Sequence, residues 1–159
     1  IPEPVRADDG APARPDAPPA VDRRPSAIPA TSAGQRRLRI LAAEDNPANR
    51  RVLSALVDAA TADLVFAEDG AQALEAWRAG PFDLVLMDVN MPVMDGLEAL
   101  GEIRRTEAAG MRIPVWMVTA NAFDEDVARY LAAGADGVLR KPIDVAALLK
   151  VLSDIAGAP

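Results

Sequence analysis

The chain has 159 residues, half of them apolar, and a formal net charge of −7. That length suits one domain of ordinary size, and the negative charge argues against non-specific binding to nucleic acid. The sequence has no cysteine and no histidine, which excludes disulfides, thiol chemistry, the commonest zinc ligand and the usual neutral-pH general base. A metal ion would therefore be a hard cation held by oxygen atoms. We expect a cytoplasmic location.

The first 36 residues differ in composition from the rest. Eight of the fourteen prolines lie there, and five acidic residues balance five arginines. Such a stretch cannot bury enough apolar surface to offset the entropy of ordering, and its prolines favour extended segments. We predict that residues 1–36 form a disordered interdomain linker and that residues 37–157 form a separate domain. A proline-rich docking motif is the alternative interpretation of the first segment.

Beyond residue 36, short apolar runs alternate with segments of helical periodicity. Strands are predicted at residues 38–43, 63–67, 83–88, 115–119 and 137–139. Helices are predicted to begin after Asn46, at Asp69–Gly70, at Asp95, at Ala122 and after Asp144, because caps, prolines and glycines mark these positions. Five successive strand–helix units with short connections predict an α/β fold, a doubly wound five-stranded parallel sheet with helices on both faces.

Periodicity also predicts which helical side chains face the core. In the first and last helices these are Val52, Leu53, Leu56, Val57, Leu148, Leu149, Leu152 and Ile155. Both tryptophans, Trp77 and Trp116, are predicted to be core residues.

Polar residues follow four of the five predicted strands. Glu44 and Asp45 follow the first, Asp88 ends the third, Thr119 ends the fourth and Lys141 follows the fifth. Ligands of open parallel sheets bind at this carboxyl edge, and three gathered carboxylates favour a magnesium ion. A carboxylate can attack phosphorus to form an acyl phosphate, which a cation, an ammonium group and a hydroxyl would stabilise. Each residue alone could be a cap, a strand end or a surface lysine, but together they favour phosphoryl transfer to Asp88.

Four motifs carry a resemblance to a known family. They are Glu44–Asp45, MDVNMPVMDG at 87–96, TANA at 119–122 and GADGVLRKPI at 134–143. With them, the segment 38–155 resembles the response-regulator receiver family, which has a flavodoxin-like fold. The sequences of these motifs are most similar to those of receivers at the C-terminus of hybrid sensor histidine kinases.

The resemblance implies a role for each site residue. Asp88 would be phosphorylated by a histidine kinase domain or a histidine phosphotransfer protein, with Thr119 and Lys141 contacting the phosphoryl group. Magnesium would be bound by Glu44, Asp45, Asp88 and the backbone carbonyl of Asn90, with Asp45 the more direct ligand. The segment would catalyse its own phosphorylation and dephosphorylation, with no separate substrate, and would contact neither nucleic acid nor membrane.

One position departs from the family pattern. Val138 stands where the family usually has a tyrosine or phenylalanine that changes rotamer together with Thr119. A β-branched residue suits a strand, so the chemistry should be unaffected while the aromatic part of the switch is missing.

Two other functions remain open at this stage. An aspartyl-phosphate phosphatase resembling haloacid dehalogenases would need a second aspartate two residues after Asp88, where Asn90 stands. A receiver that is not phosphorylated and acts only as an allosteric binding module, regulating an attached kinase, is the other alternative. Dinucleotide and P-loop sites are excluded because neither GxGxxG nor GxxxxGK occurs.

Overall fold

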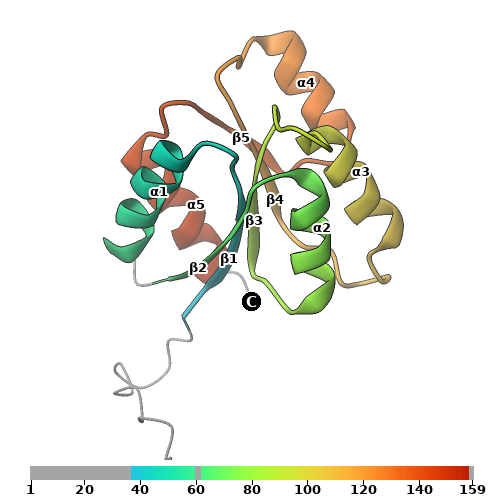
Figure 1. Cartoon of the computed structure of the whole chain (residues 1–159), viewed down its shortest axis with the longest axis horizontal. Helices are drawn as coiled ribbons and strands as arrows, with labels where there is room; N and C mark the ends of the chain where they lie inside the picture. Colours follow the sequence, from blue (N-terminus) through green and yellow to red (C-terminus); the bar gives the residue numbers. More distant parts are fainter. Residues whose placement is uncertain (1–36, 60–61, 158–159) are drawn as a thin grey trace, which may run out of the picture. The chain divides into compact units, whose positions relative to one another are not determined.

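The computed structural model describes residues 37–59 and 62–157. Within these residues the elements are β1 (Arg39–Ala43), α1 (Pro47–Ala59), β2 (Asp63–Ala67), α2 (Gly70–Ala79), β3 (Leu84–Asp88), α3 (Gly96–Thr106), β4 (Val115–Thr119), α4 (Asp124–Ala132), β5 (Gly137–Arg140) and α5 (Val145–Gly157). The strands pair in parallel in the order β2-β1-β3-β4-β5 (Figure 1). The predicted doubly wound fold is confirmed. The predicted linker, residues 1–36, lies outside the described residues.

Helices cover both faces of the sheet, because successive strand residues point to opposite faces. Leu41, Val85 and Met117 pack in one core cluster with residues of α2 and α3 and with Tyr130 of α4. The second cluster contains strand residues such as Ile40 and Leu86 together with buried residues of α1 and α5. Figure 1 accordingly shows α1 and α5 on one side of the sheet and α2 and α3 on the other.

Four of the five predicted helix starts are confirmed, each with a side-chain cap. The Asn46 carboxamide oxygen accepts from the Ala48 N–H (2.8 Å), and Asp69 accepts from Gln72 (2.8 Å). Asp95 forms a capping box with Glu98, and Asp144 accepts from Ala147 (2.9 Å). Each bond satisfies an N–H group that the first helical turn leaves without a partner.

The fourth helix begins later than predicted. α4 starts at Asp124 instead of Ala122, and the residue before it, Phe123, makes no side-chain cap. The first turn instead carries three acidic residues, Asp124, Glu125 and Asp126, which the positive end of the helix dipole stabilises. Residues 120–123 therefore form a loop directly after β4.

Two of the predicted core residues are exposed. Val52 and Leu149 have exposed fractions of 55% and 42%, whereas their neighbours Leu53 and Leu148 are buried. Each helix contacts the sheet along one side only. The face of the helix that is buried is therefore narrower than the face that its periodic apolar residues cover. Trp77 and Trp116 are half-buried and pack against the two core clusters.

Arg104 anchors the end of α4 at the amino-terminal edge of the sheet. Its Nε–H donates to the Gly134 carbonyl (2.9 Å), its Nη1 group to the Ile113 carbonyl (2.9 Å) and to Glu107 (3.0 Å), and its Nη2 group to Asp136 (2.8 Å). The network joins α3, the start of β4, the end of α4 and the start of β5. The first turn of α4 lies at the opposite edge, where the polar residues gather.

Candidate functional site

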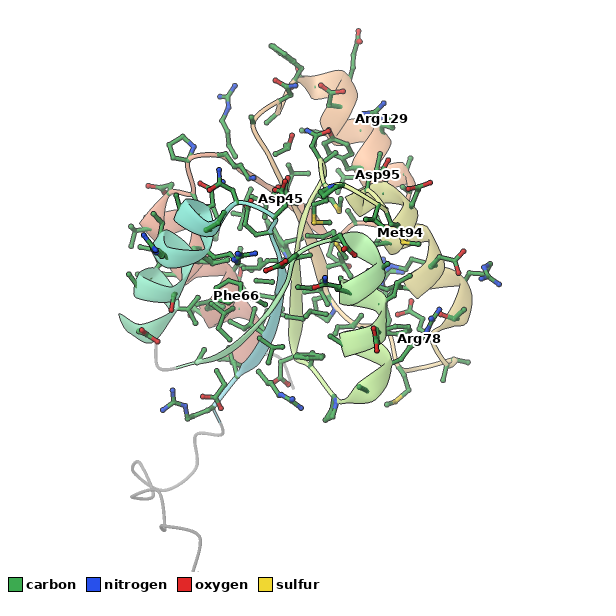
Figure 2. The ribbon with its side chains drawn as sticks, viewed as in Figure 1. Asp45, Phe66, Arg78, Met94, Asp95 and Arg129 are labelled. Carbon is green, nitrogen blue, oxygen red and sulfur yellow. The ribbon has the colours of Figure 1, made fainter. Side chains whose placement is uncertain are left out.

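The carboxyl ends of β1 and β3 bring three carboxylates together. These strands pair from Ile40↔Leu84 to Ala43↔Met87, so Glu44, which follows β1, lies beside Asp88 at the end of β3. Oxygen atoms of Glu44, Asp45 and Asp88 all lie within 4.8 Å of one another. Figure 2 shows Asp45 at this edge, in the loop between β1 and α1.

The ammonium group of Lys141 contacts two of the three carboxylates. Lys141 Nζ lies 2.8 Å from Asp88 Oδ2 and 2.9 Å from Glu44 Oε2. The backbone N–H of Lys141 also donates to the Thr119 carbonyl (2.8 Å), which fixes the start of the side chain beside β4. Three carboxylates against one ammonium give this cluster a formal charge of −2.

Burial and ion pairing act in opposite directions on these groups. Burial raises the pKa of Asp88 and outweighs the hydrogen bond from Lys141, while the charge of Glu44 raises it further. Burial also raises the pKa of Glu44, but donors from Lys141, Asn46 and Asn49 together lower it below its usual value. Burial lowers the pKa of Lys141, yet its contacts with Asp88 and Glu44 leave it above the ordinary value. Lys141 is therefore positively charged at neutral pH.

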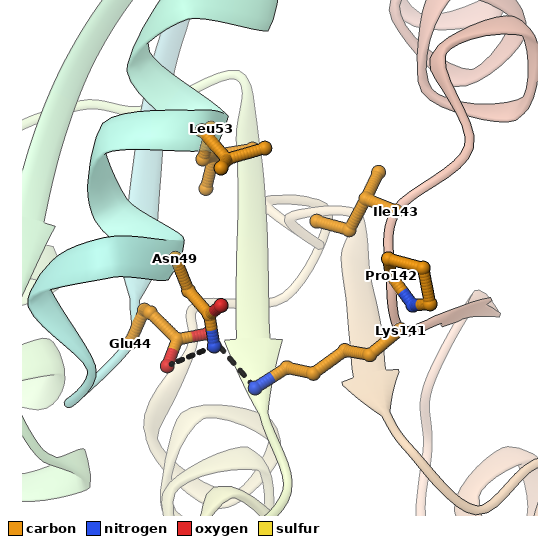
Figure 3. A pocket seen from close by; sticks show the side chains of 7 residues that line it. Glu44, Asn49, Leu53, Lys141, Pro142 and Ile143 are labelled. Carbon is orange, nitrogen blue, oxygen red and sulfur yellow. Dashed lines mark hydrogen bonds and ion pairs between the residues drawn. The ribbon is translucent and has the colours of Figure 1, made fainter.

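Glu44 is held at both its side chain and its main chain. Its Oε1 atom accepts from the Asn46 N–H (3.1 Å) and from the Asn49 carboxamide (3.3 Å). Its carbonyl accepts from Arg50 Nη1 (3.2 Å), and its N–H donates to the Ala67 carbonyl (2.9 Å). Figure 3 shows Glu44, Asn49 and Lys141 on one side of a hollow of about 100 Å³, which Val52, Leu53, Pro142 and Ile143 also line.

The loop after Asp88 is tightly folded. The Asn90 N–H donates to Asp88 Oδ1 (3.2 Å), and a β-carbon at Gly96 would clash with the Asp88 carbonyl oxygen. Val93 has a φ of 68°, in a turn closed by a bond from the Met94 N–H to the Pro92 carbonyl (2.7 Å). A β-branched residue with this φ is strained, so the surrounding contacts hold the loop in place.

Thr119 lies beside the cluster, but its hydroxyl is engaged in its own loop. Asp88 pairs with Val118, so Thr119 ends the strand next to the acceptor strand. Its Oγ1 atom accepts from the Asn121 N–H (3.1 Å) and donates to the Asn121 carbonyl (3.1 Å). The site thus brings together Glu44, Asp45, Asp88 and Lys141. The Thr119 hydroxyl would have to turn away from the Asn121 carbonyl before it could donate to a group bound there.

The donor set fits a hard divalent cation. Every candidate ligand in the cluster is a carboxylate oxygen, which suits magnesium, and a dication would neutralise the formal charge of −2. Asn49, Arg50 and Gly96 also shape the site and were not predicted. Only Gly96 had a sequence signal, as part of the MPVMDG motif.

The fold and the site together define a doubly wound α/β domain with an acidic, lysine-containing site at the carboxyl edge of its sheet. The family model "Response regulator receiver domain" matches residues 40–153. The chain belongs to this family and is a receiver domain of two-component systems. Among the residues that the structure describes, no helix is both long and apolar enough to cross a bilayer.

Curated relatives and solved structures agree with this assignment. The sensor histidine kinase GacS of Pseudomonas protegens is 36% identical over 132 residues, which are 82% of this chain and 14% of that protein. The sensory/regulatory protein RpfC of Xanthomonas campestris is 37% identical over 122 residues, 76% of this chain and 17% of that protein. The chain thus spans less than a fifth of the length of these relatives.

One solved structure is similar in both sequence and fold. It is the receiver domain of a sensor histidine kinase of Pseudomonas aeruginosa, with a magnesium ion coordinated in its active site cleft. The likeness has a TM-score of 0.70 and 36% identity, over 77% of this chain and 100% of that one. The chemotaxis response regulator CheY4 of Vibrio cholerae gives a TM-score of 0.69 and 32% identity, over 76% of this chain and 99% of that one.

Proposed function

We propose that Asp88 accepts a phosphoryl group from a phosphohistidine in a magnesium-dependent reaction. The observation that carries this proposal is a buried carboxylate, 4% exposed, with a lysine ammonium 2.8 Å from one oxygen and two further carboxylates within 4.8 Å. In the transfer, an Asp88 oxygen attacks phosphorus and the phosphorus–nitrogen bond breaks. The imidazole keeps the bonding electron pair, and the product is an acyl phosphate on Asp88.

The neighbouring residues would stabilise the transferred group. Glu44, Asp45 and Asp88 would hold magnesium, with the Asn90 carbonyl as a further ligand, and the ion would supply positive charge to the phosphoryl oxygens. Lys141 already contacts Asp88 Oδ2, so it needs only a short movement to reach an oxygen of the phosphoryl group. Thr119 would exchange its bond to the Asn121 carbonyl for one to the same group.

The phosphohistidine must come from another domain or protein, because this sequence has no histidine. The curated relatives include a sensor histidine kinase and a sensory/regulatory protein, and this chain spans only a small part of each. We therefore assign as donor a histidine kinase domain or a histidine phosphotransfer protein, with residues 1–36 as the linker to the rest of a hybrid kinase. We place this segment in the cytoplasm, and we expect it to contact neither nucleic acid nor membrane.

Mass spectrometry after incubation with acetyl phosphate and magnesium tests the proposal. One phosphate should be added and should map to the peptide that contains Asp88. Asp88→Asn, which removes the nucleophile but little volume, should not be labelled, whereas Asp58→Asn on the exposed side of α1 should be labelled like the wild type. Stoichiometric label on Asp88→Asn would refute the acceptor assignment. Failure of the wild type to take up phosphate or bind beryllofluoride would favour an unphosphorylated binding module.

A further inference from the structure

Asn49 contacts Glu44, and the proposed phosphoryl transfer assigns this contact no role. It lies near the start of α1, and its carboxamide donates to Glu44 Oε1 (3.3 Å). The other oxygen, Oε2, receives the ammonium of Lys141 (2.9 Å) (Figure 3). Oε1 also accepts from the Asn46 N–H (3.1 Å). A carboxylate held at both oxygens cannot rotate freely, so the direction of Oε2 depends on these two donors to Oε1.

We propose that Asn49 is a positioning residue for phosphoryl transfer. It orients the carboxylate of Glu44, which in turn places the Lys141 ammonium beside Asp88. This inference rests on the proposed function of Asp88 and adds to that site a residue from helix α1.

Lys141 needs such a second point of attachment. A lysine side chain is a flexible four-carbon stem that ends in a freely rotating ammonium group. With Glu44 in place, the ammonium is held between two carboxylates, 2.8 and 2.9 Å away. If Glu44 turned away, Lys141 would keep only its contact with Asp88 and would be fixed in distance but not in direction.

Arg50 supports Glu44 from the opposite end. Its Nη1 group donates to the Glu44 carbonyl (3.2 Å) and forms an ion pair with Glu68 (3.3 Å). Its side chain is 20% exposed, so these bonds are partly shielded from water. Two consecutive residues of α1 thus hold the side chain and the main chain of Glu44.

A role of Asn49 in stability alone predicts different results from a positioning role. Alanine favours helices more than asparagine does, so Asn49→Ala should leave the melting temperature unchanged or raise it. A loss of site function in the same variant therefore could not be attributed to unfolding.

The sequence provides an internal reference for the test, because Lys141 and Lys150 are its only lysines. With ¹³C,¹⁵N-lysine in the full chain, free of metal and phosphodonor, each side chain gives its own NMR signal. Asn49→Ala and Asn49→Asp should move the Lys141 signal toward that of exposed Lys150, which itself should not move. Asn49→Gln, which keeps the amide donor, should restore part of the difference.

The same variants should change the reaction. At saturating magnesium, labelling of Asp88 by acetyl phosphate should slow about fivefold in Asn49→Ala, the factor that corresponds to one ordinary hydrogen bond. Arg51→Ala, an exposed neighbour on α1, should change neither the lysine signal nor the rate. An unchanged Lys141 signal in both Asn49→Ala and Asn49→Asp, or a slowing no larger than that of Arg51→Ala, would overturn the positioning role. If wild-type Asp88 takes no phosphate, the proposed function fails instead, while the lysine signals still report on Asn49.

Discussion

Magnesium should stabilise the folded domain, and Asp45 should control the size of this effect. The carboxylate oxygens lie within 4.8 Å of one another, and two like unit charges at that separation repel by roughly 3.5 kcal/mol at an effective dielectric constant of 20. Lys141 pairs with Glu44 and Asp88, so the repulsion that remains is mainly that of Asp45 with the other two. A bound dication removes this repulsion, and only the folded chain assembles the site.

The magnitude follows from linkage between binding and folding. Magnesium at about a hundred times its dissociation constant adds ~2.7 kcal/mol to the free energy of unfolding. Over roughly 120 described residues, an unfolding entropy of ~2.1 cal/mol/K per residue converts this to an increase of ~10 °C in melting temperature. Asp45→Asn should lose most of the increase, and Glu44→Gln somewhat less, since Glu44 is already paired with Lys141.

Asp45→Asn should change the melting temperature in opposite directions without and with magnesium. Asp45→Asn lowers the formal charge of the cluster from −2 to −1, so this variant should melt above the wild type in metal-free buffer. It should melt below the wild type in millimolar magnesium. Thermal denaturation followed by circular dichroism, at matched ionic strength, measures both, and Asp58→Asn controls for the loss of one charge elsewhere. Wild-type melting curves that coincide with and without magnesium would refute the reasoning.

Three further outcomes follow from the structure. Arg104→Met should cost ~3 kcal/mol in urea unfolding, because it removes the cation that pairs with the mostly buried carboxylate of Glu107. Arg129→Met, at an exposed pair, should cost under ~1 kcal/mol. The pKa of Asp88 in the folded state is raised above the ordinary 3.8. The stability that Asp88 contributes is therefore present below pH 3.8 and is lost as the pH rises through the folded-state pKa. In metal-free buffer the wild type should lose stability relative to Asp88→Asn as the pH rises from 3.8 to the folded-state pKa. Val138→Tyr should alter partner binding more than the rate of Asp88 phosphorylation, because Val138 is half-buried and packs beside the core under α2, α3 and α4. A titration with the partner and a rate assay measure the two effects. A tenfold change in the phosphorylation rate with unchanged partner binding would contradict this prediction.

The sequence was sufficient where one local cause decides the outcome. Strands 63–67 and 115–119 were predicted to the residue, because each contains an apolar or β-branched run that a polar residue or a proline delimits at its start. The caps at Asp69, Asp95 and Asp144 were predictable for the same reason, since a short polar side chain bonds its own first helical turn. The start of α4 was placed two residues early because Ala122 and Phe123 are compatible with a helix, while the acidic first turn that fixes the start follows them.

Helix faces were predicted less well than helix limits. Periodicity identifies an apolar stripe but not how far the neighbouring elements reach across it. Val52 and Leu149 lie in their stripes and are nevertheless exposed. Their exposure depends on tertiary packing, which no window of sequence contains.

The same distinction explains which parts of the site could be predicted. Glu44, Asp45, Asp88, Thr119 and Lys141 follow strands, and a parallel sheet brings all its carboxyl ends to one edge, so topology alone gathers them. The direction of each side chain is a separate matter. The Thr119 hydroxyl turns toward Asn121, and the Lys141 ammonium lies between two acids from different strands.

Asn49 illustrates what topology leaves undetermined. It lies on a helix, so its approach to Glu44 depends on the rotation of α1 about its axis, on the Asn46 cap and on the turn of the intervening loop. The sequence contains only an asparagine five residues after a glutamate, a spacing with no chemical meaning by itself. The strand ends therefore determine which groups are present at the site, and helix α1 determines how the side chains are oriented. For this reason we expect substitutions on α1 that leave every strand-end residue intact to change the rate of phosphoryl transfer.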